Sequence, residues 1–319
     1  MASGFTVATN EHFIRGNVYS KQITSLLLDD LFAMKWIHML TDFPDGDTFI
    51  MPSLGEAETA DFAEGAAIKY NRLDTGNFPF TIDQYKYSAN SVSAQFKQDS
   101  MWASQIEAAF VPRQHRALME GIEARIFDRM NAGQTASGLN LINTAAHRWV
   151  GSGTNETIAH KDFFKARFAL TKAQVPKNNL VAVVDPSVTY ALENQTNAVN
   201  LLSPMRKYED INTNGLTTGF MFRYNFAGFD VYESNYLPKN IAETIDGKSV
   251  TVGVANFFFS ATPGDTLPVV GAFRQMPTVY SKFNPDLQQD ELFTICRYGF
   301  KARRLENIIT VLTDTDQVT

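Results

Sequence analysis

Residues 47–95 limit the possible folds most, because apolar and polar side chains alternate on both sides of one strong turn signal. Alternation of this kind is typical of β-strands with one buried face. The turn signal is Asp74-Thr75-Gly76-Asn77, a composition that favours a tight turn. We therefore predict one long β-hairpin that turns at residues 74–77. Its apolar positions are Ala66, Ile68 and Tyr70 before the turn and Phe78, Phe80, Ile82, Tyr85 and Tyr87 after it.

The aromatic side chains of this predicted hairpin need a cover that the nearby sequence does not supply. An isolated two-stranded hairpin is only marginally stable in water. Burying three aromatic rings is worth roughly 10 kcal/mol at most, at about 25 cal/mol per Å² of apolar surface. Two possibilities remain. The hairpin folds onto its own domain as an ordinary sheet, or another copy of the chain covers it. The 25 phenylalanines of the chain are consistent with extensive interfaces.

A long amphipathic helix is predicted over residues 98–131, where the helical pattern is strongest. Asp99 or Ser100 can cap its start, and Gly133 can close its end. Pro112 is expected to kink the helix or to split it into two helices in series. The apolar face comprises Ile106, Ala109, Phe110, Leu118, Met119, Ile122, Ile126, Phe127 and Met130.

The remaining segments before residue 200 predict short helices and strands. A helix is expected over Lys21–Leu40, and a short strand over Thr48–Met51 that ends at Pro52. Residues 133–158 are expected to form an exposed loop with Trp149 as its only large anchor. Further elements are a helix over Lys161–Ala173, a buried strand over Leu180–Val184 and a helix opened by Asp185-Pro186-Ser187.

Strands dominate the last third of the chain. Residues 196–219 are predicted to be irregular, and Asp246-Gly247 is predicted to form a hairpin turn. The predicted strands are Phe220–Tyr224, Phe229–Glu233, Val250–Val254, Phe257–Ser260, Leu267–Phe273, Leu292–Phe300 and Ile308–Leu312.

The composition is that of an ordinary globular protein, with 44% hydrophobic residues, 19% charged residues and a net charge of −6. Mild acidity argues against a dedicated nucleic-acid binder, since affinity for phosphate comes from clustered lysine and arginine. Cys296 is the single cysteine, so nothing indicates an oxidising compartment. No signal peptide and no membrane span are expected.

No pattern in the sequence predicts a catalytic, cofactor-binding or metal site. Gly247-Lys248-Ser249 lacks the earlier glycine of a phosphate-binding loop, because Ala242 stands there, so a hairpin turn is the better interpretation. The five histidines do not have the four-residue spacing of helix-borne metal ligands, and no Gly-x-Ser-x-Gly motif presents a serine nucleophile. Cys296 is interpreted as a packed apolar residue. An enzyme site assembled from distant residues stays open.

The order of the predicted parts resembles that of the major capsid proteins of tailed bacteriophages, which have the Hong Kong 97-type fold. That order is a short arm, a long hairpin, a long amphipathic helix, a mixed α/β region and closing strands. Single stretches are similar as well. They are Gly46-Asp47-Thr48-Phe49-Ile50-Met51-Pro52, Phe62-Ala63-Glu64-Gly65, Thr81-Ile82-Asp83-Gln84-Tyr85, Leu170 with Val175-Pro176 and residues 181–186, residues 227–238, and residues 298–306.

The resemblance implies an α+β chain with four regions. Residues 1–43 would be an N-terminal arm, and residues 44–96 an extended loop that consists of the long β-hairpin. Residues 97–175 and 274–319 would form a peripheral domain around a spine helix at 98–132. Residues 176–273 would form an axial domain.

The resemblance also implies a structural function without enzymatic activity or cofactors. The subunit would self-assemble as pentamers and hexamers into the icosahedral head of a phage, around packaged double-stranded DNA that it binds without sequence specificity. A separate scaffolding protein, a portal and decoration proteins would be its partners, with no membrane involved. Assembly would take place in the host cytoplasm, and the location would be the virion. Lys69 and Lys86 lie in the element that some relatives cross-link, but no cross-link is expected here.

Contacts between subunits are expected at the apolar residues of the hairpin, because a neighbour would supply their missing cover. Two alternatives remain. A shell of the same fold could enclose protein cargo, as encapsulins do, or the chain could be a soluble α/β hydrolytic enzyme. The residues expected at the contacts are Ile68, Tyr70, Phe78, Phe80, Ile82, Tyr85 and Tyr87.

Overall fold

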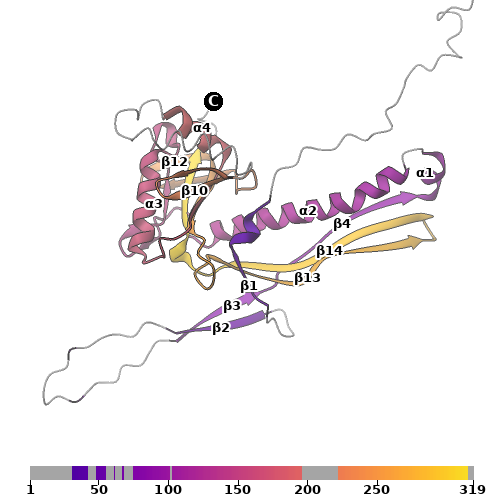
Figure 1. Cartoon of the computed structure of the whole chain (residues 1–319), viewed down its shortest axis with the longest axis horizontal. Helices are drawn as coiled ribbons and strands as arrows, with labels where there is room; N and C mark the ends of the chain where they lie inside the picture. The colour runs from indigo at the N-terminus through magenta and orange to yellow at the C-terminus, as the bar shows by residue number, and fades with distance from the viewer. Residues whose placement is uncertain are drawn as a thin grey trace, which may run out of the picture.

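The computed structural model describes residues 31–41, 48–54, 61, 67, 75–100, 103–195 and 222–314. These residues form an elongated body, a compact body and a projecting two-stranded hairpin (Figure 1). The elongated body is a long helix lying along a four-stranded sheet, and the compact body centres on a seven-stranded sheet. The α+β class predicted from the sequence is confirmed.

The long helix α2, Ala103–Ala132, is continuous through Pro112. A separate short helix α1, Ala94–Asp99, precedes it and ends at Ser100, whose backbone is extended. The predicted split at Pro112 is therefore wrong. Pro112 and Ala108, whose carbonyl loses its amide partner to the proline, both lie at exposed positions where water can bind. The buried face of α2 includes Leu118, Ile122, Ile126, Phe127 and Met130.

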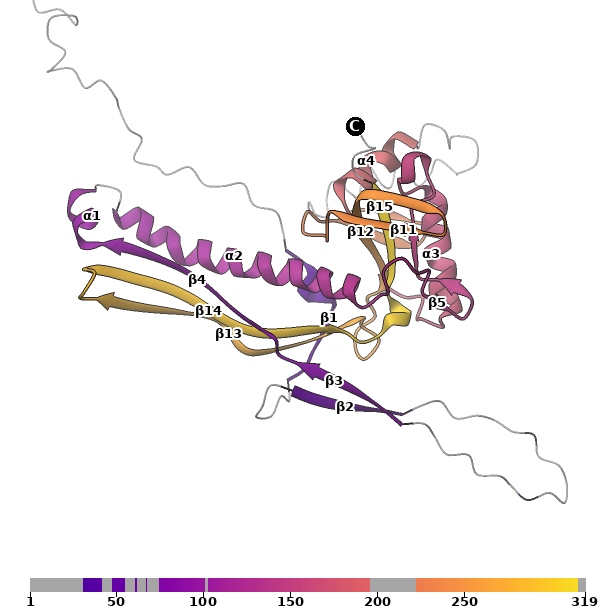
Figure 2. The same ribbon diagram turned by 180° about the vertical axis from the view of Figure 1, so that it is seen from behind.

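The four-stranded sheet, called the long sheet below, has the strand order β1-β13-β14-β4. Its centre is a hairpin of two long antiparallel strands, β13 (Val269–Asn284) and β14 (Gln289–Ala302). The strand β4, Gln84–Ser93, pairs with β14 without a shift in register. The helix α2 runs along this sheet, which makes the body long and narrow (Figure 2).

The segment of residues 31–41 crosses from α2 to the long sheet. Its backbone amides at Phe32 and Ala33 donate to the buried carboxylate of Glu123, at 3.2 and 2.9 Å. A 3₁₀ turn at Ala33–Trp36 follows, and β1 (Ile37–Met39) pairs in parallel with β13. The predicted helix over residues 21–40 is therefore wrong for residues 31–40, because these tertiary contacts override the local helical pattern. Residues 21–30 lie outside the described part.

The seven-stranded sheet has the order β7-β15-β12-β8-β10-β9, with β11 paired to β12. The helices α3 (His160–Lys172) and α4 (Pro186–Gln195) lie with it, and Phe163 of α3 packs edge-on against Phe258 of β12. On the opposite face Phe127 of α2 stacks on Phe257 of β12, at 5.9 Å between ring centroids. The strands are β7 (Arg148–Val150), β8 (Leu180–Val184), β9 (Phe222–Phe226), β10 (Phe229–Glu233), β11 (Ile241–Ile245), β12 (Lys248–Ser260) and β15 (Ile309–Asp314).

Residues 133–158 are not the exposed loop that the sequence predicted. They form β5 (Leu141–Ile142), β6 (Ala145–Ala146) and β7, a buried strand at the edge of the seven-stranded sheet. Arg148 is only 1% exposed, and its guanidinium binds the carboxylate of Glu243, with 2.7 Å between Nη2 and Oε1. A distant carboxylate thus allows a charged residue to be buried where the local sequence indicated a loop.

The projecting hairpin consists of β2 (Thr48–Leu54) and β3 (Thr75–Thr81), paired from Thr48↔Thr81 to Leu54↔Thr75. The turn predicted at residues 74–77 is therefore wrong, since 75–77 belong to β3. Pro52 does not end β2, because a proline is accepted where its nitrogen points to a free edge. The chain leaves the hairpin at Ile82 and Asp83 and enters the long sheet as β4.

We expect Arg148 and Glu243 to stabilise the folded chain only when both are present. Replacing Glu243→Leu leaves a buried guanidinium without its carboxylate and should lower the free energy of unfolding by about 3–5 kcal/mol. The double variant R148M/E243L should recover most of that loss in chemical denaturation. Asp128→Asn, at an exposed position, is the control and should change stability by no more than about 0.5 kcal/mol. A double variant as unstable as the single one would contradict this account.

Candidate functional site

One face of the long sheet carries exposed aromatic and aliphatic side chains, which we call the aromatic face. Tyr85 and Tyr87 of β4 are 62% and 74% exposed. Tyr87 lies opposite Ile295, and Phe293 lies opposite Tyr280 with their rings stacked at 5.6 Å. Residues directly opposite each other on paired strands share a face. The aromatic face therefore extends across β4, β14 and β13. Tyr85, Tyr87, Phe293 and Ile295 help to line a hollow of about 480 Å³.

The opposite face of the long sheet is closed by α2. Gln114 of α2 accepts from the Thr294 hydroxyl at 2.9 Å and donates to the Asn90 side chain at 2.8 Å. Burial raises the pKa of Tyr298 to about 12 and also raises the pKa of the Cys296 thiol. Both groups therefore stay protonated, and the prediction that Cys296 is a packed residue is confirmed. Among the described residues, one face of the long sheet is therefore covered by α2 and the other is exposed.

The base of the hairpin is fixed to the long sheet by an apolar cluster. Phe80 and Ile82 are buried against Val270 and Ala272 of β13. The ammonium of Lys301 donates to the carbonyl of Pro79 at 2.7 Å and lies over the Phe78 ring. Phe80 and Ile82, expected at subunit contacts, are thus covered by their own chain.

The predicted contact residues fall into three groups. Tyr85 and Tyr87 are exposed on the aromatic face, and Phe78 is half-buried at the hairpin base. Phe80 and Ile82 are buried. Ile68 and Tyr70 lie outside the described residues. The sequence missed Phe293, Ile295 and Tyr280, whose alternation along β13 and β14 could have indicated the same face.

Asp83 ties the link between the hairpin and β4 to the long helix. Its carboxylate binds Arg125 at 2.9 Å and also binds Arg129. Burial raises the pKa of Asp83, but the hydrogen bond from Gln84 and the charges of Arg129 and Arg125 outweigh it, so the pKa lies below its usual value. The carboxylate is therefore ionised and holds the link against α2.

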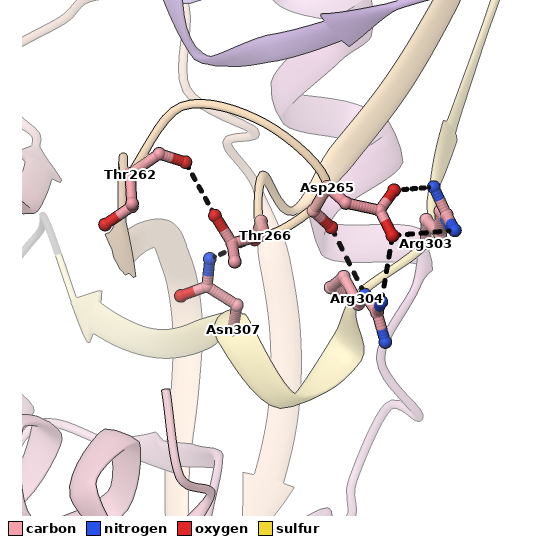
Figure 3. Close-up of polar contacts among 6 residues, drawn as sticks. All are labelled: Thr262, Asp265, Thr266, Arg303, Arg304 and Asn307. Atoms are coloured by element: carbon pink, nitrogen blue, oxygen red, sulfur yellow. Dashed lines mark hydrogen bonds and ion pairs between the residues drawn. The ribbon is translucent and has the colours of Figure 1, made fainter. Parts of the chain in front are cut away.

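Two short connections join the long sheet to the compact body, and a single carboxylate binds the second of them (Figure 3). Residues 261–268 lead from β12 to β13, and residues 303–308 lead from β14 back to β15. Asp265 in the first connection forms ion pairs with Arg303 and Arg304 in the second. The backbone amide of Arg303 also donates to the Pro268 carbonyl, at 2.9 Å. The two connections therefore run side by side.

Asn307 forms a second, buried set of hydrogen bonds between the same two connections, which together we call the joint. Its side-chain amide donates to the carbonyls of Ser260 and Thr266, both at 2.8 Å, and its oxygen accepts from the Ser260 amide at 2.7 Å. Gln134, which follows α2, donates to the Ile308 carbonyl at 2.6 Å. The end of the long helix is thus held by the same joint.

His147 is a buried titratable group beside this joint. Its ring is fully buried, with Nδ1 at 3.1 Å from the carbonyl of Ala145. Burial lowers the pKa of His147, and the nearby backbone of Ala145 and Glu306 raises it by less. The imidazole is therefore neutral in the folded chain at pH values where an exposed histidine begins to take up a proton.

The described residues hold no group of three or more His, Cys, Asp or Glu side chains that could bind a metal ion. No helix in the described part is both long and apolar enough to cross a membrane. Gly247-Lys248-Ser249 opens β12 after a turn in which Asp246 and Gly247 have φ angles of 52° and 76°. The predicted hairpin turn is confirmed there.

The described residues thus combine a long sheet, closed on one face by a helix and exposed on the other, with a projecting hairpin, an arrangement consistent with a structural subunit. A family model described as phage capsid protein matches residues 80–310. The chain therefore belongs to the phage capsid protein family and is a structural subunit of a tailed-phage head. The resemblance inferred from the sequence is confirmed.

Solved structures with the same fold and low sequence identity include phage capsids. The structure titled Mycobacterium phage Che8 is 17% identical, covers 94% of this chain and 97% of its own, and has a TM-score of 0.65. The capsid of cyanophage P-SCSP1u is 14% identical. The match covers 97% of this chain and 94% of that one, with a TM-score of 0.70. The cyanophage Pam1 capsid is 13% identical. The match covers 99% of this chain and 100% of that one, with a TM-score of 0.69. No curated protein matches the chain.

Acid should destabilise the chain through His147. The unfolded chain binds a proton at its ordinary pKa near 6.5, whereas the folded chain binds it only at lower pH. The unfolding free energy should therefore fall as the pH drops below about 6.5, by no more than about 1.4 kcal/mol per pH unit from this group. His147→Gln should reduce this slope in denaturation at pH 7.5 and pH 5, while His115→Gln, at an exposed position, should not. Equal slopes for wild type and His147→Gln would refute the role of His147.

A side chain at Gly299 should push the hairpin base away from β14. An added Cβ would lie 2.6 Å from the Thr81 carbonyl oxygen and 2.9 Å from the Ile82 Cα, both backbone atoms that cannot rotate away. We expect Gly299→Ala to lower the unfolding free energy by roughly 1–3 kcal/mol and to speed proteolysis near residue 82. The control is Gly121→Ala, which meets no atom within 4 Å. It should raise stability by about 0.5–1 kcal/mol, and equal effects of the two variants would argue against close packing at Gly299.

Proposed function

We propose that copies of this chain associate as pentamers and hexamers into a closed icosahedral head, using the aromatic face as a contact between subunits. The observation that carries the proposal is the asymmetry of the long sheet: α2 covers one face, and Tyr85 and Tyr87 stand exposed on the other. Tyrosine is enriched at protein interfaces, because its ring is apolar and its hydroxyl can still bind a polar partner.

The energy available at this face supports an association that depends on many copies. Fully burying one exposed aromatic ring contributes up to about 3 kcal/mol. Two tyrosines and the neighbouring Phe293 and Ile295 therefore give a contact that is modest for one pair of subunits. A closed shell repeats each contact around every subunit, so modest contacts add up.

We also propose the division into arm, extended loop, peripheral domain and axial domain that the resemblance implies, with boundaries moved. The pairing of β4 with β14 supports ending the extended loop near Asp83 instead of residue 96. The strands β7 and β15 and the helix α3 pack with the seven-stranded sheet, which supports placing them in the axial domain. The peripheral domain then consists of α2, β4, β13 and β14, and residues 1–43, which include β1, remain the arm.

The proposed contents of the head are double-stranded DNA, held without recognition of its sequence. The net charge of −6 supports this, because a weakly acidic wall forms few of the salt-dependent contacts that hold DNA on a basic surface. A scaffolding protein, a portal and decoration proteins are the partners we expect during assembly in the host cytoplasm. A shell with protein cargo is the alternative, and the contents of purified particles distinguish the two.

Electron microscopy tests the proposal directly. The chain, expressed alone and with its neighbouring gene products, should form closed shells, and particles purified from infected cells should contain DNA. The variant Tyr87→Ser should abolish or strongly reduce shells while leaving the subunit folded, because the Tyr87 side chain is 74% exposed. Tyr190→Ser, a similarly exposed tyrosine on α4, is the matched control and should still assemble. Normal shells from Tyr87→Ser would exclude the aromatic face as a required contact.

A further inference from the structure

The strand β4 is an edge of the long sheet with no strand beside it among the described residues. The order β1-β13-β14-β4 places it at the end, and all of its residue pairs are made with β14. Its ten residues pair without a bulge, contain no proline and carry one charge, at Lys86. A long, regular, nearly uncharged edge is a ready template for another strand.

The backbone groups that face outward from β4 can be assigned from one hydrogen bond. The amide of Ala94 donates to the carbonyl of Gln288 at 2.8 Å, directly beyond the last pair of the ladder, Ser93↔Gln289. In an antiparallel ladder, residues that bond to the partner strand alternate with residues whose N–H and C=O point away from it. The odd-numbered residues therefore point to the free edge, namely Tyr85, Tyr87, Ala89 and Ser91.

The free edges of the hairpin and of β13 are blocked. Pro52 in β2 and Pro79 in β3 each remove a donor from the hairpin, and Lys301 occupies the Pro79 carbonyl. The free side of β13 contains Pro277 and two shifts in register between Phe273 and Thr278. Proline and irregular register prevent strand addition. The part of β13 that β1 leaves uncovered is thus blocked, whereas the free side of β4 has neither a proline nor a shift in register.

The space beside β4, where an added strand would run, contains a hollow. A hollow of about 510 Å³ lies along it, between Lys86, Tyr87 and Ser88 and the helix α2. The wall on the helix carries the small residues Ala117, Gly121 and Ala124, and nothing lies within 4 Å of a side chain built at Gly121. Alternate side chains of an incoming strand could enter this hollow and cover the aromatic face on the other side.

We propose that the free edge of β4 pairs with an extended strand of a second copy of this chain. Outward amides and carbonyls at alternating positions recognise a polypeptide backbone, and an edge with a single charge offers little to an anion such as DNA. The edge is continuous with Tyr85 and Tyr87, so one neighbouring copy would reach both. This inference rests on the proposed function, since it requires copies that assemble side by side.

Hydrogen exchange compares the edge in shells and in dissociated subunits. The amides of Tyr85, Tyr87, Ala89 and Ser91 should exchange at least about tenfold more slowly in shells, because they gain a backbone partner there. The amides of Lys86 and Ser88 already bond to β14 and should be slow in both states. Shells whose odd-numbered amides exchange as fast as those of subunits would overturn this inference alone. A complete absence of shells would overturn the proposed function and this inference with it.

A pair of variants at one position tests the same edge by assembly. Ala89→Pro removes an outward N–H without removing a bond to β14, and Ala89→Ser keeps that N–H. Shells of Ala89→Pro should form at least about tenfold less well or dissociate at lower denaturant, while Ala89→Ser should match wild type. Thermal melting of the isolated subunits shows whether Ala89→Pro has damaged the fold itself. Wild-type yield and stability of Ala89→Pro shells would overturn the proposal.

Discussion

The second half of α2 is the contact on which the rest of this structure depends. Its buried side chains pack against both sheets within one continuous core, in which Phe127 stacks on Phe257 of β12 and which also contains Ile122 and Tyr298 of β14. Removing this helix would expose the inner face of the long sheet and one face of the seven-stranded sheet together. The relative position of the two bodies is therefore set by the same apolar contacts that stabilise each of them.

The sequence predicted well those elements whose signals are local. The helix α3, the strands β8 and β10 and the turn at Asp246-Gly247 lie where the pattern placed them, because each has its period, cap or turn residue within a few positions. The order of elements also indicated the family. These signals do not require knowledge of which segments meet in space.

The errors arose where distant residues decide the structure. Arg148 is buried because Glu243, 95 positions away, neutralises it, and no local pattern reveals that partner. Residues 31–40 follow the carboxylate of Glu123 instead of their helical pattern. The turn signal at residues 74–77 was misleading, because Gly76 and Asn77 are tolerated in a strand that has a free edge. The exposed face was predicted in part, at Tyr85 and Tyr87, and missed at Phe293 and Tyr280, which only the register of β13 and β14 brings beside them.

The paired connections at Asp265 have a mechanical consequence. Two short links fastened to each other restrict how the bodies that they join can move, and the packing of α2 against both sheets restricts that movement further. The Asp265 side chain is 58% exposed and Asn307 is buried. The ion pairs of Asp265 are therefore accessible to solvent, while the hydrogen bonds of Asn307 are not. We expect a subunit jointed in this way to adjust its angle by small amounts without unfolding. Identical chains could then occupy positions of unequal curvature in one container.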